Sequence, residues 1–103
     1  GINISANEVD NNLDGCPGVG AHATIGLPDD RLGERICTFI VQTGDVEPTL
    51  DSIAEYLDSI GVAKRLRPEH IEFIDAIPMT ESGKVKRHQL ADELDRRLKE
   101  RAE

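Results

Sequence analysis

The sequence contains no tryptophan and has only one tyrosine and two phenylalanines among its 103 residues. A hydrophobic core therefore has to be built from aliphatic side chains. The apolar fraction of 38% is enough for one modest core, and the length fits one domain of ordinary size. We expect a single domain whose core is made of isoleucine, leucine, valine and alanine.

Long apolar runs and an excess of basic residues are also missing. No segment approaches the length that a membrane-spanning helix needs, and the opening residues GINIS lack the basic start and apolar stretch of a signal peptide. The formal net charge is −8, whereas nucleic acids and anionic membranes attract a basic face. We therefore expect no nucleic-acid partner, no transmembrane segment and a cytoplasmic location.

Cysteine and histidine are scarce. Cys16 and Cys37 lack a CxxC spacing, and the three histidines lack the spacing of a metal site. We expect free thiols, as is usual in the cytosol, and no metal ligands in the chain. Gly1 is not preceded by a methionine, and we expect the chain to be a piece cut from a longer polypeptide.

Capping signals predict three helices. Ser5 and Glu8 form the pattern of a capping box at the start of the first helix. Thr49 can cap the second, which Gly61 ends, and the third is expected to begin near His88. The fold class that follows is α+β, a small and partly antiparallel sheet packed with about three helices.

Three segments have the pattern of strands. Residues 35–43, RICTFIVQT, are almost continuously apolar and predict a central strand covered on both faces. Residues 71–77, IEFIDAI, predict another strand. Residues 19–26 alternate, which places four side chains on one apolar face, namely Val19, Ala21, Ala23 and Ile25. A polar loop or turn, LPDDRLGE, is expected over residues 27–34.

Positive charge gathers in one stretch of this acidic chain. Residues 78–87, PMTESGKVKR, predict a hairpin-like turn with Gly83 at the bend, followed by Lys84, Lys86 and Arg87. The stretch is not a P-loop, because a proline stands where the first glycine belongs and a valine follows the first lysine. Two interpretations stay open: a solvated turn, or a lysine that contacts a phosphate or carboxylate.

Four segments resemble, in order along the chain, the C-terminal part of the adenylate-forming superfamily, which includes acyl-CoA synthetases, luciferases and nonribosomal-peptide adenylation domains. IPMTESGKVKRHQL resembles its signature of a proline, four residues, Gly-Lys and a basic pair. GINISANEVD resembles the segment after the family's hinge, and IGLPDDRLGE resembles its Gly-x-Pro-Asp followed by Gly-Glu. GVAKRLRPEHIEF resembles its Lys-x-x-x-Pro-x-x-Ile/Val-x-Phe stretch.

The resemblance implies that residues 1–103 are the single, mobile C-terminal domain of an AMP-forming acid–CoA ligase, without its hinge and large N-terminal domain. Such enzymes join a carboxylic acid, fatty or other, to AMP by using ATP and Mg²⁺, and then transfer the acyl group to CoA. The domain rotates against the large domain between these steps. We expect none of ATP, Mg²⁺ and CoA to bind this domain alone, and we expect the domain alone to be inactive.

The resemblance also implies roles for single residues. Lys84 matches the lysine that stabilises the adenylation transition state, and acylation, set by a lysine acylase and a deacylase, would remove its charge. Gly1 matches a glycine that lines the pantetheine tunnel. Gly83 would let the backbone approach a ligand closely, while Lys86 and Arg87 would contact the large domain or attract phosphates.

Two other functions remain open. The chain could be part of an adenylation domain that loads a carrier protein, since that phosphopantetheine arm would enter the same tunnel. It could also be a non-enzymatic binding module that uses the basic turn as a docking point. The acid stays unassigned, because the large domain selects it.

Overall fold

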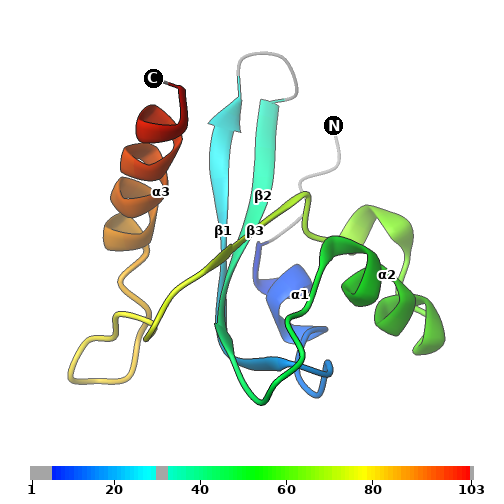
Figure 1. Ribbon diagram of the computed structural model, residues 1–103. Helices are drawn as coiled ribbons and strands as arrows, with labels where there is room; N and C mark the ends of the chain where they lie inside the picture. Colours follow the sequence, from blue (N-terminus) through cyan, green and yellow to red (C-terminus); the bar gives the residue numbers. More distant parts are fainter. Residues whose placement is uncertain (1–5, 30–32, 103) are drawn as a thin grey trace.

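The computed structural model describes residues 6–29 and 33–102 of the chain. Within these residues a three-stranded sheet lies between helix α3 on one face and helices α1 and α2 on the other (Figure 1). The predicted α+β class, with three helices and a small mixed sheet, is confirmed. Gly1 and Ser5 lie outside the described residues, so the predicted Ser5–Glu8 cap remains a prediction.

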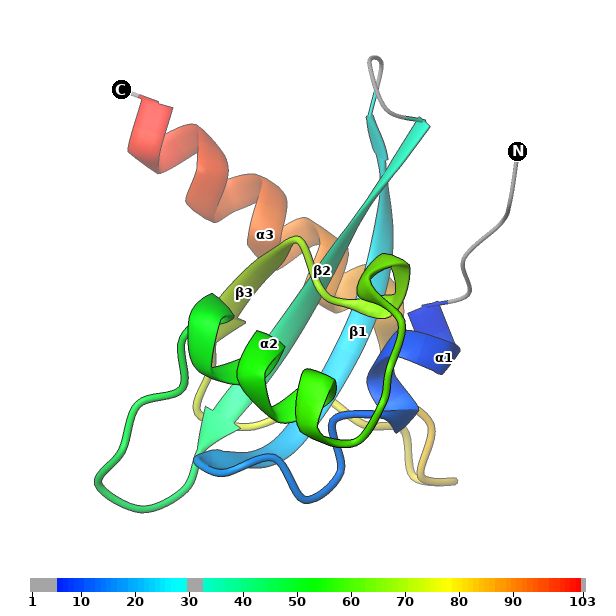
Figure 2. The same cartoon turned by 90° about the vertical axis from the view of Figure 1, so that its right-hand side faces the viewer.

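The elements follow one another as α1 Ala6–Asn11, β1 Val19–Asp29, β2 Gly33–Gln42, α2 Leu50–Ser59, the one-turn 3₁₀ helix η1 Lys64–Leu66, β3 His70–Phe73 and α3 Arg87–Ala102. Seen after a quarter turn, α2 crosses in front of the sheet and α3 lies behind it (Figure 2). None of the helices in the described part of the chain is long and apolar enough to cross a membrane.

Strand β2 is the centre of the sheet. It pairs antiparallel with β1, with Ala23 opposite Phe39, and parallel with β3, with Thr38 opposite Ile71. All five side chains of the run 36–40 are buried, which confirms the prediction of a strand covered on both faces.

Alternate residues of β2 enter two separate cores. The α2-side cluster consists of Leu13, Cys16, Val19, Ile40, Ile53 and Leu57. The α3-side cluster consists of Ala23, Ile25, Cys37, Phe39, Leu90 and Leu94. Both cysteines are free and buried, and burial raises the pKa of the Cys37 thiol to about 12. That thiol therefore stays protonated and serves as a packing group.

Strand β1 differs from its prediction at both ends. The register shifts between Val19 and His22, so Val19 lies in the α2-side cluster while Ala23 faces α3. Ala21 is exposed. The bulge has moved the apolar residues onto opposite faces, a change that alternation alone does not reveal. The predicted loop 27–34 was also wrong in extent, because Leu27–Asp29 and Gly33–Glu34 continue the two strands.

Helix α1 is fastened to β1 by a polar cluster. The Oδ1 atom of Asp10 lies 2.8 Å from Nδ1 of His22 and accepts a hydrogen bond from the Thr24 hydroxyl at 2.9 Å. The Nε2 atom of His22 lies 2.7 Å from Asp14. Hydrogen bonds to Asp10, and more weakly to Asp14, raise the pKa of His22 against the opposing effect of burial. The Thr24 hydroxyl also meets that of Thr38 at 2.8 Å, so this buried pair is satisfied.

Helix α2 has the predicted cap. The Thr49 hydroxyl accepts a hydrogen bond from the backbone N–H of Ser52 at 3.0 Å. The Ser52 hydroxyl in turn accepts one from the backbone N–H of Thr49 at 2.9 Å. Gly61 follows the helix with a φ of 79°, which a residue with a side chain rarely adopts. Ile53 and Leu57 point into the α2-side cluster.

Strand β3 is shorter than predicted and carries a buried acid. It ends at Phe73 instead of continuing to Ile77, and Ile74 and Ile77 pack instead against the α3-side cluster. Glu72 is only 4% exposed. It accepts from Arg101 at 2.7 Å through both oxygens, from Arg97 at 3.1 Å, and pairs with His70. These bonds, that of Arg101 foremost, hold the pKa of Glu72 at about 2.

The free energy of unfolding should fall as the pH drops from about 4.5 towards 2, because Glu72 then takes up a proton and releases its two arginines. A carboxyl with a depressed pKa in the folded state stabilises the fold above its unfolded pKa and loses this effect below. We expect a loss of about 2 kcal/mol, less than the full shift implies because the Arg101 side chain is 54% exposed. Urea unfolding at several pH values measures it.

The comparison that isolates this carboxyl uses two variants. Glu72→Gln should flatten the pH dependence in this range, whereas Asp95→Asn, which breaks the exposed pair with Lys99, should leave it unchanged. An unaltered pH profile in Glu72→Gln would contradict the assignment.

Candidate functional site: the Lys84 turn

The basic stretch forms a short hairpin between β3 and α3. Lys86 N–H donates to the Pro78 carbonyl at 2.9 Å, and Thr80 N–H donates to the Lys84 carbonyl at 2.7 Å. Met79 and Val85 form an antiparallel bridge between these two bonds. Helix α3 begins immediately afterwards, so the hairpin is attached directly to its first turn.

Gly83 closes the bend. Its N–H donates to the Thr80 carbonyl at 3.0 Å, and its φ is 87°. A four-residue turn whose last residue is a glycine of positive φ is the pattern of a three-residue hairpin loop with a bulge. The glycine at the bend was predicted from the sequence, and the structure confirms it there.

The Thr80 side chain braces the bend from inside. Its Oγ1 accepts the Lys84 backbone N–H at 3.0 Å and lies 3.0 Å from the Ser82 hydroxyl. Threonine hydroxyls often satisfy nearby backbone groups in turns. The backbone on both sides of the Lys84 Cα is thus held by Thr80, through its side chain and its N–H.

Alternation along the second arm separates the lysines from the core. Val85 packs against the α3-side cluster, whereas Lys84 and Lys86 are exposed. Among the residues that the structure describes, no carboxylate forms an ion pair with Lys84. Its ammonium is therefore presented to the outside from a backbone that is held in place.

Arg87, the third basic residue, is also exposed, but its guanidinium is bonded to the body of the domain. Its Nη1 donates to the Thr24 carbonyl at 2.7 Å, and its Nη2 donates to Oδ1 of Asn7 at 2.6 Å. The first residue of α3 thereby contacts both β1 and α1.

Four of the five residues predicted for the site lie together in this region: Gly83, Lys84, Lys86 and Arg87. Gly1 lies outside the described residues. Sequence reasoning missed Thr80, although a threonine beside a glycine turn is a usable signal. It also missed Asn7 and Thr24, which have no local pattern that indicates a contact with Arg87. In the described ranges, no three His, Cys, Asp or Glu side chains are grouped as metal ligands.

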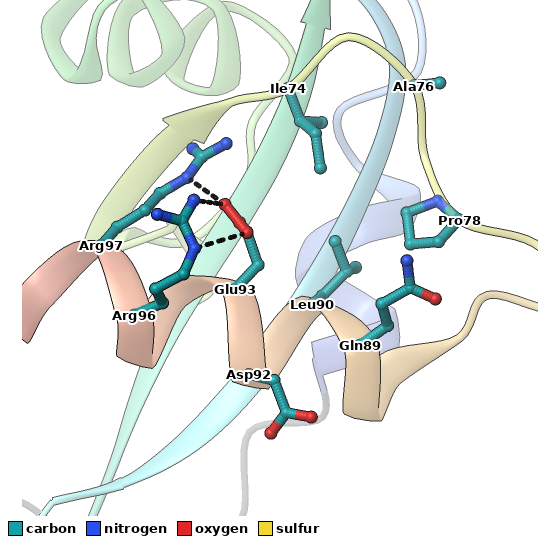
Figure 3. A pocket seen from close by; sticks show the side chains of 9 residues that line it. All are labelled: Ile74, Ala76, Pro78, Gln89, Leu90, Asp92, Glu93, Arg96 and Arg97. Carbon is teal, nitrogen blue, oxygen red and sulfur yellow. Dashed lines mark hydrogen bonds and ion pairs between the residues drawn. The ribbon is translucent and has the colours of Figure 1, made fainter.

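A pocket lies beside the hairpin, between the connection after β3 and the first half of α3 (Figure 3). Pro78 and Gln89 lie at one end, and Arg96 and Arg97 lie at the other. Both arginines are paired with Glu93, as the dashed lines show. Lys84 does not line this pocket, so we do not include the pocket in the candidate site.

Thr80→Val should speed amide exchange at Lys84 without changing global stability. It keeps the shape of the side chain but removes the acceptor of the Lys84 N–H. A hydrogen bond of about 1 kcal/mol corresponds to roughly fivefold faster exchange. Hydrogen exchange followed by NMR measures the rate, and Thr80→Ser, which keeps the hydroxyl, is the matched control. Equal exchange rates in the two variants would rule out this role.

Comparison with known proteins identifies the family to which the chain belongs. The model of the "AMP-binding enzyme C-terminal domain" matches residues 8–84, and so ends at Lys84. The chain is 35% identical to a salicyl-AMP ligase / salicyl-S-ArCP synthetase of Mycobacterium tuberculosis, over 91% of this chain and 16% of that protein. It is 34% identical to a medium-chain fatty-acid–CoA ligase of Escherichia coli, over 95% of this chain and 18% of that protein.

A solved structure gives the same result. The apo structure of Mycobacterium smegmatis MbtA superposes with a TM-score of 0.79 at 33% identity, over 87% of this chain and 17% of that chain. The chain thus spans less than a fifth of the length of these relatives. It belongs to the AMP-binding enzyme C-terminal domain family, which forms the C-terminal domain of adenylate-forming ligases.

Proposed function

We propose that this domain supplies the adenylation lysine, Lys84, to an AMP-forming acid–thiol ligase and rotates against a large domain between the two steps of the reaction. The observation that carries the proposal is the Lys84 turn itself. Its backbone is fixed by Thr80 and Gly83, its side chain is exposed, and no described carboxylate neutralises it. A fixed, unpaired ammonium on a projecting turn is suited to an anionic site in another domain.

The first step forms an acyl-adenylate. A carboxylate oxygen of the acid attacks the α-phosphorus of ATP, and the bond to pyrophosphate breaks. Negative charge is shared by the attacking carboxylate and the α-phosphate, and the Lys84 ammonium, placed between them, stabilises this transition state. Mg²⁺, which the large domain would hold, supplies charge neutralisation of the phosphates.

The second step transfers the acyl group. The thiol sulfur attacks the acyl carbon, the thioester bond forms, AMP leaves and the thiol proton passes to solvent. Lys84 has no role in this chemistry, so rotation can withdraw it and present another face of the domain. Gly1, at the opposite end of the chain from the turn, would then line the pantetheine tunnel, where a side chain would obstruct the thiol arm.

The acceptor that we propose is CoA, with ATP and a carboxylic acid as the other substrates. The fatty-acid–CoA ligase of E. coli supports CoA. The relative named as a salicyl-S-ArCP synthetase supports a second candidate, an enzyme that loads a carrier. Both acceptors present a thiol at the end of a flexible arm, so the role of Lys84 is the same in either case.

Lys84→Ala in the full-length ligase should lower adenylation at least about 100-fold, because an electrostatic contact made in the transition state is lost. ATP–pyrophosphate exchange with a panel of aliphatic and aromatic acids measures this step. Thioester formation from preformed acyl-adenylate, with CoA as acceptor, measures the other and should stay within a few-fold of wild type.

Lys86→Ala is the matched control, since it removes the neighbouring exposed lysine of the same hairpin. It should change adenylation less than tenfold. If Lys84→Ala leaves both steps unchanged, the turn is only a solvated part of the domain and the proposed function is wrong.

Acylation of Lys84 would switch the enzyme off. The modification replaces the ammonium by a neutral amide, and the exposed position makes it accessible to an acylase and a deacylase. Mass spectrometry of the protein from its native cell should find the acylated peptide, more so when deacylases are blocked. A peptide that stays unmodified under both conditions would contradict this regulation.

A further inference from the structure

Arg87 is an exposed residue of the hairpin region, but its guanidinium is bonded to groups of the same domain. Its guanidinium bridges two acceptors that lie 63 and 80 residues away in the sequence, the Thr24 carbonyl and the Asn7 side chain. Three elements, α1, β1 and the first turn of α3, are therefore joined at one side chain.

The Lys84 turn has little freedom to move independently of Arg87. Lys84 precedes Arg87 by three residues, and the intervening Lys86 is held on both sides. Its N–H donates to the Pro78 carbonyl at 2.9 Å, and its carbonyl accepts from Gln89 and Leu90 at 3.1 and 3.3 Å. The direction in which the turn projects consequently follows the placement of the first turn of α3.

The two groups that receive Arg87 differ in burial, because Thr24 is buried and Asn7 is exposed. Thr24 is 1% exposed, and its hydroxyl is bonded to Asp10 and Thr38. Asp10 belongs to α1 and also holds His22. The bond to the Thr24 carbonyl therefore ties the start of α3 to a buried part of β1, and the bond to Asn7 adds a contact with α1.

We propose that Arg87 is a positioning residue for Lys84: its guanidinium fixes the start of α3 against β1 and α1, and so sets where the Lys84 ammonium arrives in the adenylation arrangement. This inference rests on the proposed function of Lys84. It assigns Arg87 a different role from direct attraction of phosphates, because both of its observed contacts lie within the domain.

The two roles predict different results for Arg87→Lys. An attraction for phosphates needs the positive charge, which lysine keeps. Positioning needs a planar group with several donors that reaches two acceptors at once, which lysine lacks. Asn7→Ala gives a second comparison, since it removes one acceptor of Arg87 and changes no charge.

The experiment uses the full-length ligase and the acid with the highest rate of ATP–pyrophosphate exchange. Arg87→Lys should lower the kcat of adenylation about tenfold, and Asn7→Ala several-fold, with the KM for ATP within twofold of wild type. Thioester formation from preformed acyl-adenylate should stay within twofold in both variants. Hydrogen exchange should be faster at residues 80–86 and unchanged in α2.

A double-mutant cycle tests whether Arg87 acts through Lys84. In the Lys84→Ala background, Arg87→Lys should lower adenylation by less than twofold, because no ammonium is left to position. A merely structural role would lower both half-reactions together and would persist in that background.

Three results would overturn the proposal: wild-type adenylation in Arg87→Lys, a full tenfold loss in the Lys84→Ala background, or a raised KM for ATP with unchanged kcat. The first would instead indicate a role that needs only the positive charge, and the third would indicate a direct contact of the guanidinium with ATP. Lys84→Ala alone reports on the proposed function. If that variant is fully active, both proposals fail, and if only Arg87→Lys is active, the positioning role alone fails.

Discussion

The burial of both faces of β2 is the constraint on which the rest of the domain depends. Because Ile40 and Phe39 point to opposite sides, each face needs its own cover, and α2 and α3 have to lie on opposite sides of the sheet. The chain leaves β3 and has to reach the α3 face before the last helix can form. The hairpin that carries Lys84 lies in this connection, which makes it a projection from the domain with a fixed base.

The candidate site is positively charged, whereas the protein as a whole is negatively charged. The protein has a net charge of −8, yet Lys84 and Lys86 lie on a hairpin with no described ion-pair partner. Three arginines of α3, in contrast, already form ion pairs within the domain. Arg97 and Arg101 bind Glu72, and Arg96 binds Glu93. The pairs of Arg97 and Arg101 with Glu72 hold α3 on the sheet, whereas the two lysines of the turn are left to meet a partner.

The sequence predicted those features that depend on neighbours along the chain. The continuous apolar run of β2, the Thr49 cap of α2 and Gly83 at the bend are of this kind, and each is found in the structure. The bulge near Val19, the burial of Glu72 and the inward contacts of Arg87 could not be predicted. They depend on residues that are distant in sequence, such as Arg101 for Glu72 and Asn7 for Arg87, and no local pattern brings these together.

The surroundings of Gly83 define what kind of constraint the bend imposes. Apart from the adjacent residues, no heavy atom lies within 4 Å of the position that a Cβ would take there. Space is available for a side chain. Only the positive φ of 87° disfavours L-amino acids other than glycine at this position. The bend therefore restricts the chirality of the residue and not the size of its side chain. A D-alanine at this position would adopt the same φ, would place its methyl group in solvent and would stiffen the turn.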